Sequence, residues 1–150
     1  MDKIERTEYN CTIEGTIMES DSSSVEAMVT EDMTAKALSS GNLDVLGTPA
    51  MIALMENAAL NVVAKAFTEG YDSVGIDVLV VHNRPTRIGS KVTAIATLTK
   101  MEGRKLTFEV VACDEKGEIG RGIHNRFIIN VEKFLLKAEK MPEEDEASKE

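Results

Sequence analysis

The stretch G-T-P-A-M-I-A-L-M-E-N-A-A-L-N-V-V-A-K-A-F-T-E-G, residues 47–70, decides the fold of this chain. It predicts one long helix, with Thr48 as the N-cap, Pro49 at the first helical position and Gly70 as the stop signal. On a helical projection only Asn57, Asn61 and Lys65 form a narrow polar stripe, and nearly every other position is apolar. The pattern therefore predicts a helix that is buried on most of its sides.

Glu56 lies outside that polar stripe, on a part of the predicted helix that it shares with Ile52, Leu60 and Phe67. An ionised carboxylate among apolar side chains is costly unless something pairs with it. Two interpretations remain open. In the first, Glu56 is a structural carboxylate: either it is buried and hydrogen-bonded to backbone or to a strand residue, or the helix is less buried than the pattern predicts. In the second, Glu56 is a carboxylate placed for acid–base or nucleophilic chemistry.

After residue 70 the hydrophobic period changes from about 3.6 to 2, which predicts strands. The predicted strands cover residues 73–83, 91–101, 106–114 and 119–131, and a shorter one precedes the helix at residues 25–29. In the first of the four, alternation places Val74, Ile76, Val78, Val80 and His82 on one face, and Gly75, Asp77, Leu79 and Val81 on the other. Gly120 and Gly122 in the last strand predict a bulge or the close approach of another backbone.

A strand, a buried helix and four antiparallel strands in meander order predict an α+β fold in which the helix lies along one face of a strongly curved sheet. Every hairpin is expected to be local. Such an arrangement leaves a sheet edge and part of the helix exposed, so we expect pairing with a second copy of the chain.

The chain divides into three segments. Residues 1–22 form an N-terminal arm whose weak alternation is compatible with an extra strand, residues 23–136 form one domain, and residues 137–150 form an acidic tail that we predict to be disordered. Of the net charge of −9, most lies at the ends: residues 1–30 hold seven acids against two bases, and residues 137–150 hold six against three. The central domain is therefore nearly neutral.

Composition excludes several classes of function. An acidic chain without a basic helix or an aromatic–basic platform is a poor nucleic-acid binder. No apolar run is long enough to span a membrane and the N-terminus lacks the apolar stretch of a signal peptide, so we expect a cytoplasmic protein with no membrane partner. Cys11 and Cys113 have no ligand-like spacing, so neither a metal site nor a disulfide framework is expected.

His82 and Thr48 are the polar residues best placed to accompany Glu56. His82 ends the strand face that covers the helix, where a single histidine is usually structural, but a pair with Glu56 is geometrically reasonable. Thr48 before a proline is explained by ordinary capping, yet a helix N-terminus also suits a developing oxyanion. Thr48 and Glu56 lie about 12 Å apart along the axis, so either a small substrate bridges the gap or a second subunit contributes one of the two groups.

Two further groups of polar residues have alternative interpretations. His124 shares a face with Gly122 and Arg126, and we favour a structural or rim role for it. Basic residues outnumber acids between positions 84 and 105, which indicates either a solubilising surface or a phosphate-binding rim.

At this point the sequence resembles a known family. The segments that carry the resemblance are residues 45–51, 54–56, 70, 73–75 and 81–82, within a match from about Val25 to Phe134. They are similar to the hotdog-fold acyl-CoA thioesterases of the fluoroacetyl-CoA thioesterase-like branch. The resemblance implies a hotdog fold, in which a long central helix is wrapped by a curved antiparallel five-stranded sheet. It also implies a homodimer or a dimer of dimers, with active sites at the subunit interface.

The resemblance implies a catalytic set of Thr48, Glu56 and His82, and makes the Gly75 backbone a candidate for binding the thioester carbonyl. Glu56 would act as general base or nucleophile, His82 would orient it and carry the proton, and Thr48 would position the substrate or attack it.

The expected reaction is hydrolysis of a small acyl-CoA thioester to coenzyme A and a free carboxylic acid, with no metal and no cofactor beyond the coenzyme A of the substrate. Arg84, Arg87 and Arg126 are expected to meet its phosphates near the mouth of the pocket. A non-catalytic module that binds acyl-CoA or an acyl carrier is the alternative on the same fold. An acyl-CoA hydratase is a third possibility, but its usual Asp/His motif is not found in this sequence.

Overall fold

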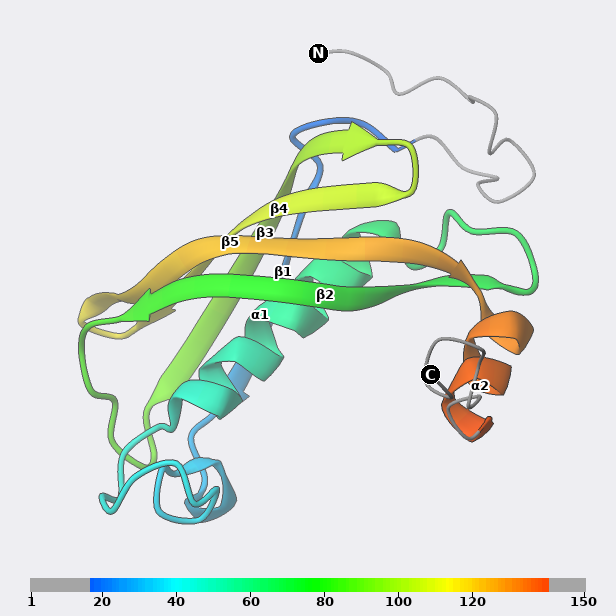
Figure 1. The fold of residues 1–150 in the computed structure, drawn as a ribbon. Helices are drawn as coiled ribbons and strands as arrows, with labels where there is room; N and C mark the ends of the chain where they lie inside the picture. The colour runs from blue at the N-terminus through cyan, green and yellow to red at the C-terminus, as the bar shows by residue number, and fades with distance from the viewer. Residues whose placement is uncertain (1–16, 141–150) are drawn as a thin grey trace, which may run out of the picture.

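The computed structural model of the chain describes residues 17–140 (Figure 1). The elements in chain order are β1 (Ser22–Met28), the 3-10 helix η1 (Glu31–Met33), α1 (Thr48–Val63), β2 (Tyr71–His82), β3 (Lys91–Glu102), β4 (Lys105–Asp114), β5 (Gly117–Asn130) and α2 (Val131–Glu139). The extra strand expected in the N-terminal arm and most of the acidic tail fall outside the described residues. Within residues 17–140, no helix has the length and apolar character that crossing a bilayer requires.

The five strands form one antiparallel sheet in the order β1-β3-β4-β5-β2, and this sheet curves around α1 (Figure 1). The expected α+β arrangement of a long helix and a five-stranded sheet is therefore confirmed. The core lies between them, where Met51, Met55 and Val63 of α1 are fully buried with inward residues such as Leu98 and Phe108. Each fully buried side chain of this size contributes about 1.5–3 kcal/mol relative to exposure.

The position of β2 corrects the expected meander. β2 pairs with β5 and lies at an edge of the sheet, so it is not the neighbour of β3. The connection after His82 crosses to the other edge, where Leu46 N donates to Thr86 O (2.8 Å) and Gly89 N donates to Val29 O (2.9 Å). These bonds fix the connection to the end of β1 and to the segment before α1. The strand that ends in His82 is consequently an edge strand.

Helix α1 is shorter and less buried than predicted. The predicted N-cap, Thr48, is the first helical residue instead, and Gly47 occupies the cap position without a side-chain hydrogen bond. The helix ends at Val63, while Gly70 adopts a φ of +89° in the turn before β2. The helix stops early because the next residues turn back, with Ala66 N donating to Val63 O (3.0 Å), which buries Ala66. Only one stripe of α1 is buried in the protomer, so Glu56 is half-buried.

A β-bulge in β2 corrects the predicted strand faces. The register with β5 shifts between Gly75 and Asp77, so Ile76 is the extra residue. A bulge of one residue inverts the side-chain alternation beyond it. Gly75 therefore faces inward together with His82, while Ile76, which the simple alternation placed inward, is 49% exposed. Val74 likewise lies outward, beside Ile76 in a cavity on the outer face of the sheet.

Gly120 and Gly122 of β5 have the role that the sequence predicts. A Cβ atom at Gly122 would lie 2.1 Å from the carbonyl oxygen of Leu79, and one at Gly120 would lie 2.6 Å from that of Val81. A Cβ at Gly120 would also lie 2.7 Å from Sδ of Met51. The absence of side chains at these positions therefore lets β2 and α1 approach β5 closely.

Helix α2 was not predicted. Its N-cap is Asn130, whose side chain accepts a hydrogen bond from Lys133 N (3.0 Å), so β5 ends there and the chain turns into a helix. The helix runs through Glu139, and the first residues assigned to the disordered tail are therefore helical. In Figure 1 this helix lies at the opposite end of β2 from His82.

Candidate active site

Thr48 and His82 are in direct contact. Thr48 Oγ1 lies 2.8 Å from Nδ1 of His82, so the first residue of α1 meets the last residue of β2. Both residues line a cavity of about 320 Å³ together with Arg84. The other ring nitrogen of His82, Nε2, is buried and has no hydrogen-bond partner among the described residues. A buried polar atom without a partner is unusual in a folded protein.

The surroundings of His82 favour its neutral form. Burial lowers the pKa of His82 from its ordinary value of 6.5, and the backbone of Arg84 opposes this only in part. A neutral imidazole accepts a proton at one nitrogen and donates from the other. The hydroxyl of Thr48 and the unpartnered Nε2 are therefore arranged at the two ends of a possible proton-transfer path.

Glu56 belongs to a second polar group, which lies further along α1. A Cβ atom on Gly75 would lie 2.6 Å from Oε2 of Glu56 and 3.1 Å from Cε1 of His124. Any side chain at position 75 would therefore displace the carboxylate. Glycine at position 75 leaves room for the Glu56 carboxylate, which is a physical reason for a glycine at this position.

The protonation state of His124 follows from its partners. Its Nδ1 lies 2.9 Å from the carbonyl oxygen of Asp77, which only accepts, so Nδ1 donates. Its Nε2 lies 3.3 Å from Nη1 of Arg126, which only donates, so Nε2 accepts and the ring is neutral. Burial lowers the pKa of His124 and the charge of Arg126 acts in the same direction, whereas the carboxylate of Glu56 opposes them.

Arg126 lies in the interior. It is 6% exposed, and it donates from Nε to Ser73 Oγ (2.9 Å) and from Nη2 to the Ser73 carbonyl (2.9 Å). The expectation that Arg126 lies at the mouth of a pocket is therefore wrong, because its side chain is buried and its guanidinium is hydrogen-bonded to Ser73. Burial lowers the pKa of Arg126, and the charges of Glu56 and Asp72 act to raise it. Arg126 is thus the cation that faces the Glu56 carboxylate.

Arg84 and Arg87 lie on the connection after β2. Arg84 forms an ion pair with Asp114 (Nη2 to Oδ1, 2.6 Å), and its side chain is 37% exposed where it lines the cavity. Arg87 is exposed and forms an isolated β-bridge with Val45. Both positions are compatible with contact to a substrate outside the core.

Asp114 is a site residue that the sequence did not single out. It accepts hydrogen bonds from Arg84, from Thr86 Oγ1 (2.9 Å) and from Lys116 N (2.8 Å). Burial acts to raise the pKa of Asp114, but these three donors outweigh it and lower the pKa below its ordinary value. The ionised carboxylate therefore anchors the connection that follows His82.

Within one protomer the predicted residues fall into two groups. Thr48, His82 and Arg84 meet at one end of α1, whereas Glu56 and Gly75 meet His124 and Arg126 further along. Thr48 and Glu56 are about 12 Å apart along the helix, and Gly75 and His82 about 20 Å apart along the strand. The histidine beside Glu56 is thus His124, which the sequence assigned a structural or rim role. In the described range, no cluster of three His, Cys, Asp or Glu residues is placed to hold a metal ion.

Comparisons with known proteins agree with this architecture. Residues 29–132 match the family model of the fluoroacetyl-CoA-specific thioesterases. The fluoroacetyl-CoA thioesterase of Streptantibioticus cattleyicolor is 39% identical over 94 residues, which cover 63% of this chain and 68% of that protein.

Solved structures show the same similarity. A variant of the fluoroacetyl-CoA-specific thioesterase FlK, solved in complex with fluoroacetate and CoA, is 32% identical and superposes with a TM-score of 0.75 over 78% of this chain and 98% of that one. A hot-dog-like protein from Thermanaerovibrio acidaminovorans shares the fold, with a TM-score of 0.74 at 21% identity over 83% of this chain and 94% of that chain. The expected hotdog fold is confirmed.

Proposed function

Since this chain belongs to the fluoroacetyl-CoA-specific thioesterase family and hydrolyses an acyl-CoA thioester, we propose that its substrate carries a small acyl group and that Thr48, Glu56 and His82 perform the reaction. The observation that carries this proposal is the 2.8 Å contact between Thr48 and His82 at a cavity of about 320 Å³. That volume is near the lower end of the range of small-molecule sites. The relatives named for fluoroacetyl-CoA support a short acyl group.

In the proposed reaction Glu56 is the general base. Its carboxylate takes a proton from a water molecule, whose oxygen attacks the thioester carbon. The oxyanion that forms is stabilised by the N-terminus of α1 and by the Gly75 backbone. When the carbon–sulfur bond breaks, the neutral ring of His82 takes the proton from Glu56 at Nε2 and passes it to the departing thiolate, so the ring ends neutral and Glu56 ends ionised. Thr48 holds His82 through Nδ1 and so fixes the orientation of the ring.

The separation of the two polar groups leads us to include a homodimer in the proposal. Glu56 and the unpartnered Nε2 of His82 belong to different groups in one protomer, and β2, which carries His82, is an exposed edge of the sheet. Leu79 and Val81 on this edge strand are 79% and 56% exposed, as expected for a surface that a second copy covers. In the proposed dimer, Thr48 and His82 of one protomer meet Glu56 of the other.

The substrate class is tested by measuring thiol release from a series of acyl-CoA thioesters of increasing chain length. We expect the highest kcat/KM for two- to four-carbon acyl groups, with a decrease of about tenfold or more for a long acyl chain. A preference for long acyl chains would contradict the assignment of a small acyl group.

Arg87→Gln is expected to raise KM with little change in kcat if Arg87 contacts the phosphates of coenzyme A.

The proposed site, shared between two protomers, is tested by unfolding and refolding two strongly impaired variants together, Thr48→Ala and Glu56→Gln. Random pairing makes about half of the dimers mixed. If Thr48 and Glu56 act across the interface, each mixed dimer holds one intact site out of two, so about a quarter of wild-type activity returns. Light scattering should give about twice the chain mass of 16.4 kDa. No recovery from a confirmed mixed dimer would show that both residues act within one subunit, and a monomeric wild type would exclude the dimer.

A further inference from the structure

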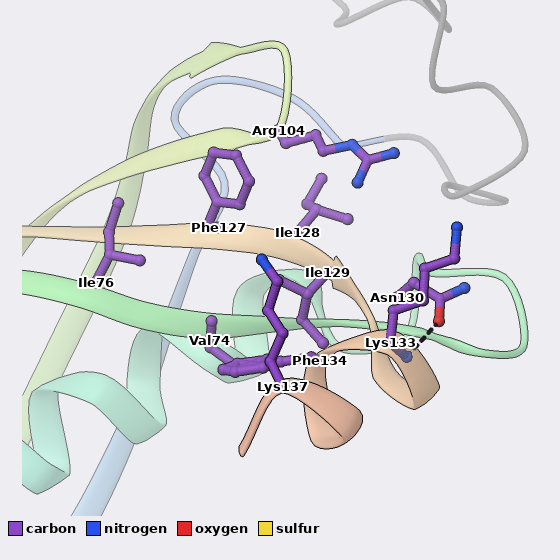
Figure 2. Close-up of a pocket in the computed structure, with 10 residues that line it drawn as sticks. All are labelled: Val74, Ile76, Arg104, Phe127, Ile128, Ile129, Asn130, Lys133, Phe134 and Lys137. Atoms are coloured by element: carbon purple, nitrogen blue, oxygen red, sulfur yellow. Dashed lines mark hydrogen bonds between the residues drawn. The ribbon is translucent and has the colours of Figure 1, made fainter. Parts of the chain in front are cut away.

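A second cavity, of about 440 Å³, lies between α2 and the outer face of β2 and β5 (Figure 2). Its walls are mostly apolar, and include Val74 and Ile76 from β2, Phe127 from β5 and Phe134 from α2. Ile76 is 49% exposed and Phe127 is 38% exposed. The bulge in β2 turns Ile76 away from the core, so this apolar surface does not contribute to the packing around α1.

Positive charge surrounds the same cavity. Arg104 from the turn between β3 and β4 and Lys133 and Lys137 from α2 contribute to its lining, and the ten lining residues include no acid. Figure 2 shows that the stem of Lys137 extends over the apolar wall beside Val74 and Phe134. Three cations beside an apolar cavity are notable in a chain whose net charge is −9.

This cavity is separate from the cavity that contains Thr48 and His82. None of its lining residues lines the cavity that contains Thr48 and His82. Val74 and His82 are about 25 Å apart along β2, and Val74 points to the outer face of the sheet. The cations at this cavity are therefore not explained by the binding of substrate at the Thr48–His82 pair of the same protomer.

We propose that the cavity between α2 and the sheet binds a fatty carboxylate, an activity that goes beyond the hydrolysis of small acyl-CoA thioesters. The alkyl chain lies against Val74, Ile76 and Phe127, where it removes exposed apolar surface from water. The carboxylate lies at Lys133 and Lys137, whose ammonium groups donate charge-assisted hydrogen bonds. Apolar walls with a few polar groups at one side are the usual composition of a small-molecule site.

The test is isothermal titration of the full-length protein with dodecanoate below its micellar concentration. We expect saturable binding, at least about tenfold weaker for hexanoate because less apolar surface is buried, and at least about tenfold weaker for dodecyltrimethylammonium, which has the same chain and the opposite charge. The double variant Lys133→Gln/Lys137→Gln should weaken dodecanoate binding by about tenfold or more. Ile76→Thr, which keeps a β-branched shape, should also weaken it.

The matched control is Lys65→Gln/Lys116→Gln, which removes the same charge from two exposed positions outside the cavity. It should bind dodecanoate as the wild type does, and both double variants should retain thioesterase activity, which shows that they fold. Equal affinities of the two double variants for dodecanoate would overturn the proposal, as would the absence of binding by the wild type. Displacement of dodecanoate by coenzyme A would also overturn it, because the cavity would then belong to the substrate. Loss of this binding leaves the thioesterase assignment untouched, since hydrolysis is measured separately.

Discussion

Glu56→Gln is expected to reduce kcat for acyl-CoA hydrolysis by about 10³-fold, within the range that a positioned acid or base contributes. Gln has nearly the shape of Glu but cannot take a proton from water, so the change removes the chemistry and keeps the packing against Gly75. The measurement is thiol release under saturating acyl-CoA, together with isothermal titration of the product coenzyme A. Binding of coenzyme A should remain within a few-fold of the wild-type value, since Glu56 lies outside the cavity that contains Arg84.

Glu109→Gln is a suitable control, because it makes the same chemical change at an exposed position of β4 that belongs to neither polar group. It should hydrolyse the substrate at the wild-type rate. If Glu56→Gln retained full turnover while folding normally, Glu56 would not be the base. Protein quenched during turnover and analysed by mass should show no acyl adduct; an adduct on Glu56 or Thr48 would mean that the residue attacks the substrate itself.

His82→Ala is expected to reduce kcat/KM by about 10²–10³-fold, and Thr48→Ala by about 10²-fold, since each change breaks the same contact. If the two residues act as a unit, the double variant should be no worse than His82→Ala alone. Thr48→Ser, which keeps the hydroxyl, should retain most of the activity. Additive losses in the double variant would show that the 2.8 Å contact is not used in the reaction.

The pH dependence of the same variants provides a second readout. Burial lowers the pKa of His82 below 6.5, so in the protein the neutral, active ring persists to lower pH than an exposed histidine would. The acidic limb of kcat/KM should therefore lie below pH 6.5, and activity should be constant above it until another group titrates. His82→Ala should change the position of this limb, whereas Thr48→Ala should keep it. An acidic limb above pH 6.5 would contradict the neutral His82 described for the cavity.

Much of the fold follows from local patterns in the sequence. The start of α1 at residue 48 follows from Gly-Thr-Pro, and the close approach of strands at Gly120 and Gly122 follows from glycines inside an apolar strand. The shared inward face of Gly122, His124 and Arg126 also agrees with alternation, because β5 has no bulge between these residues. Each of these features depends on a few neighbouring residues, which is why the sequence alone is sufficient to predict them.

The remaining features depend on partners that the sequence does not name. The bulge at Ile76 exists only with respect to β5, so alternation within β2 cannot reveal it. The edge position of β2 results from a connection that is bound to distant backbone groups at Leu46 and Val29. The proximity of Glu56 to Gly75 and His124 brings together α1, β2 and β5, which are distant in the sequence. Helix α2 does not depend on distant partners, because its N-cap Asn130 and the helical pattern after it are local signals from which the sequence could have predicted it.

The pairing of β2 with β5 also has a consequence for the order in which the site can assemble. β3, β4 and β5 are joined by tight hairpins, whereas β2 pairs with residues that are distant in the chain, such as Tyr71 with Asn130. Closing a long loop costs more entropy than closing a hairpin, and contacts of high sequence separation slow folding. A chain that had formed only the three-stranded meander would hold much of the core but would not have His82 beside Thr48. Recovery of catalytic activity therefore reports completion of the non-local pairing between β2 and β5.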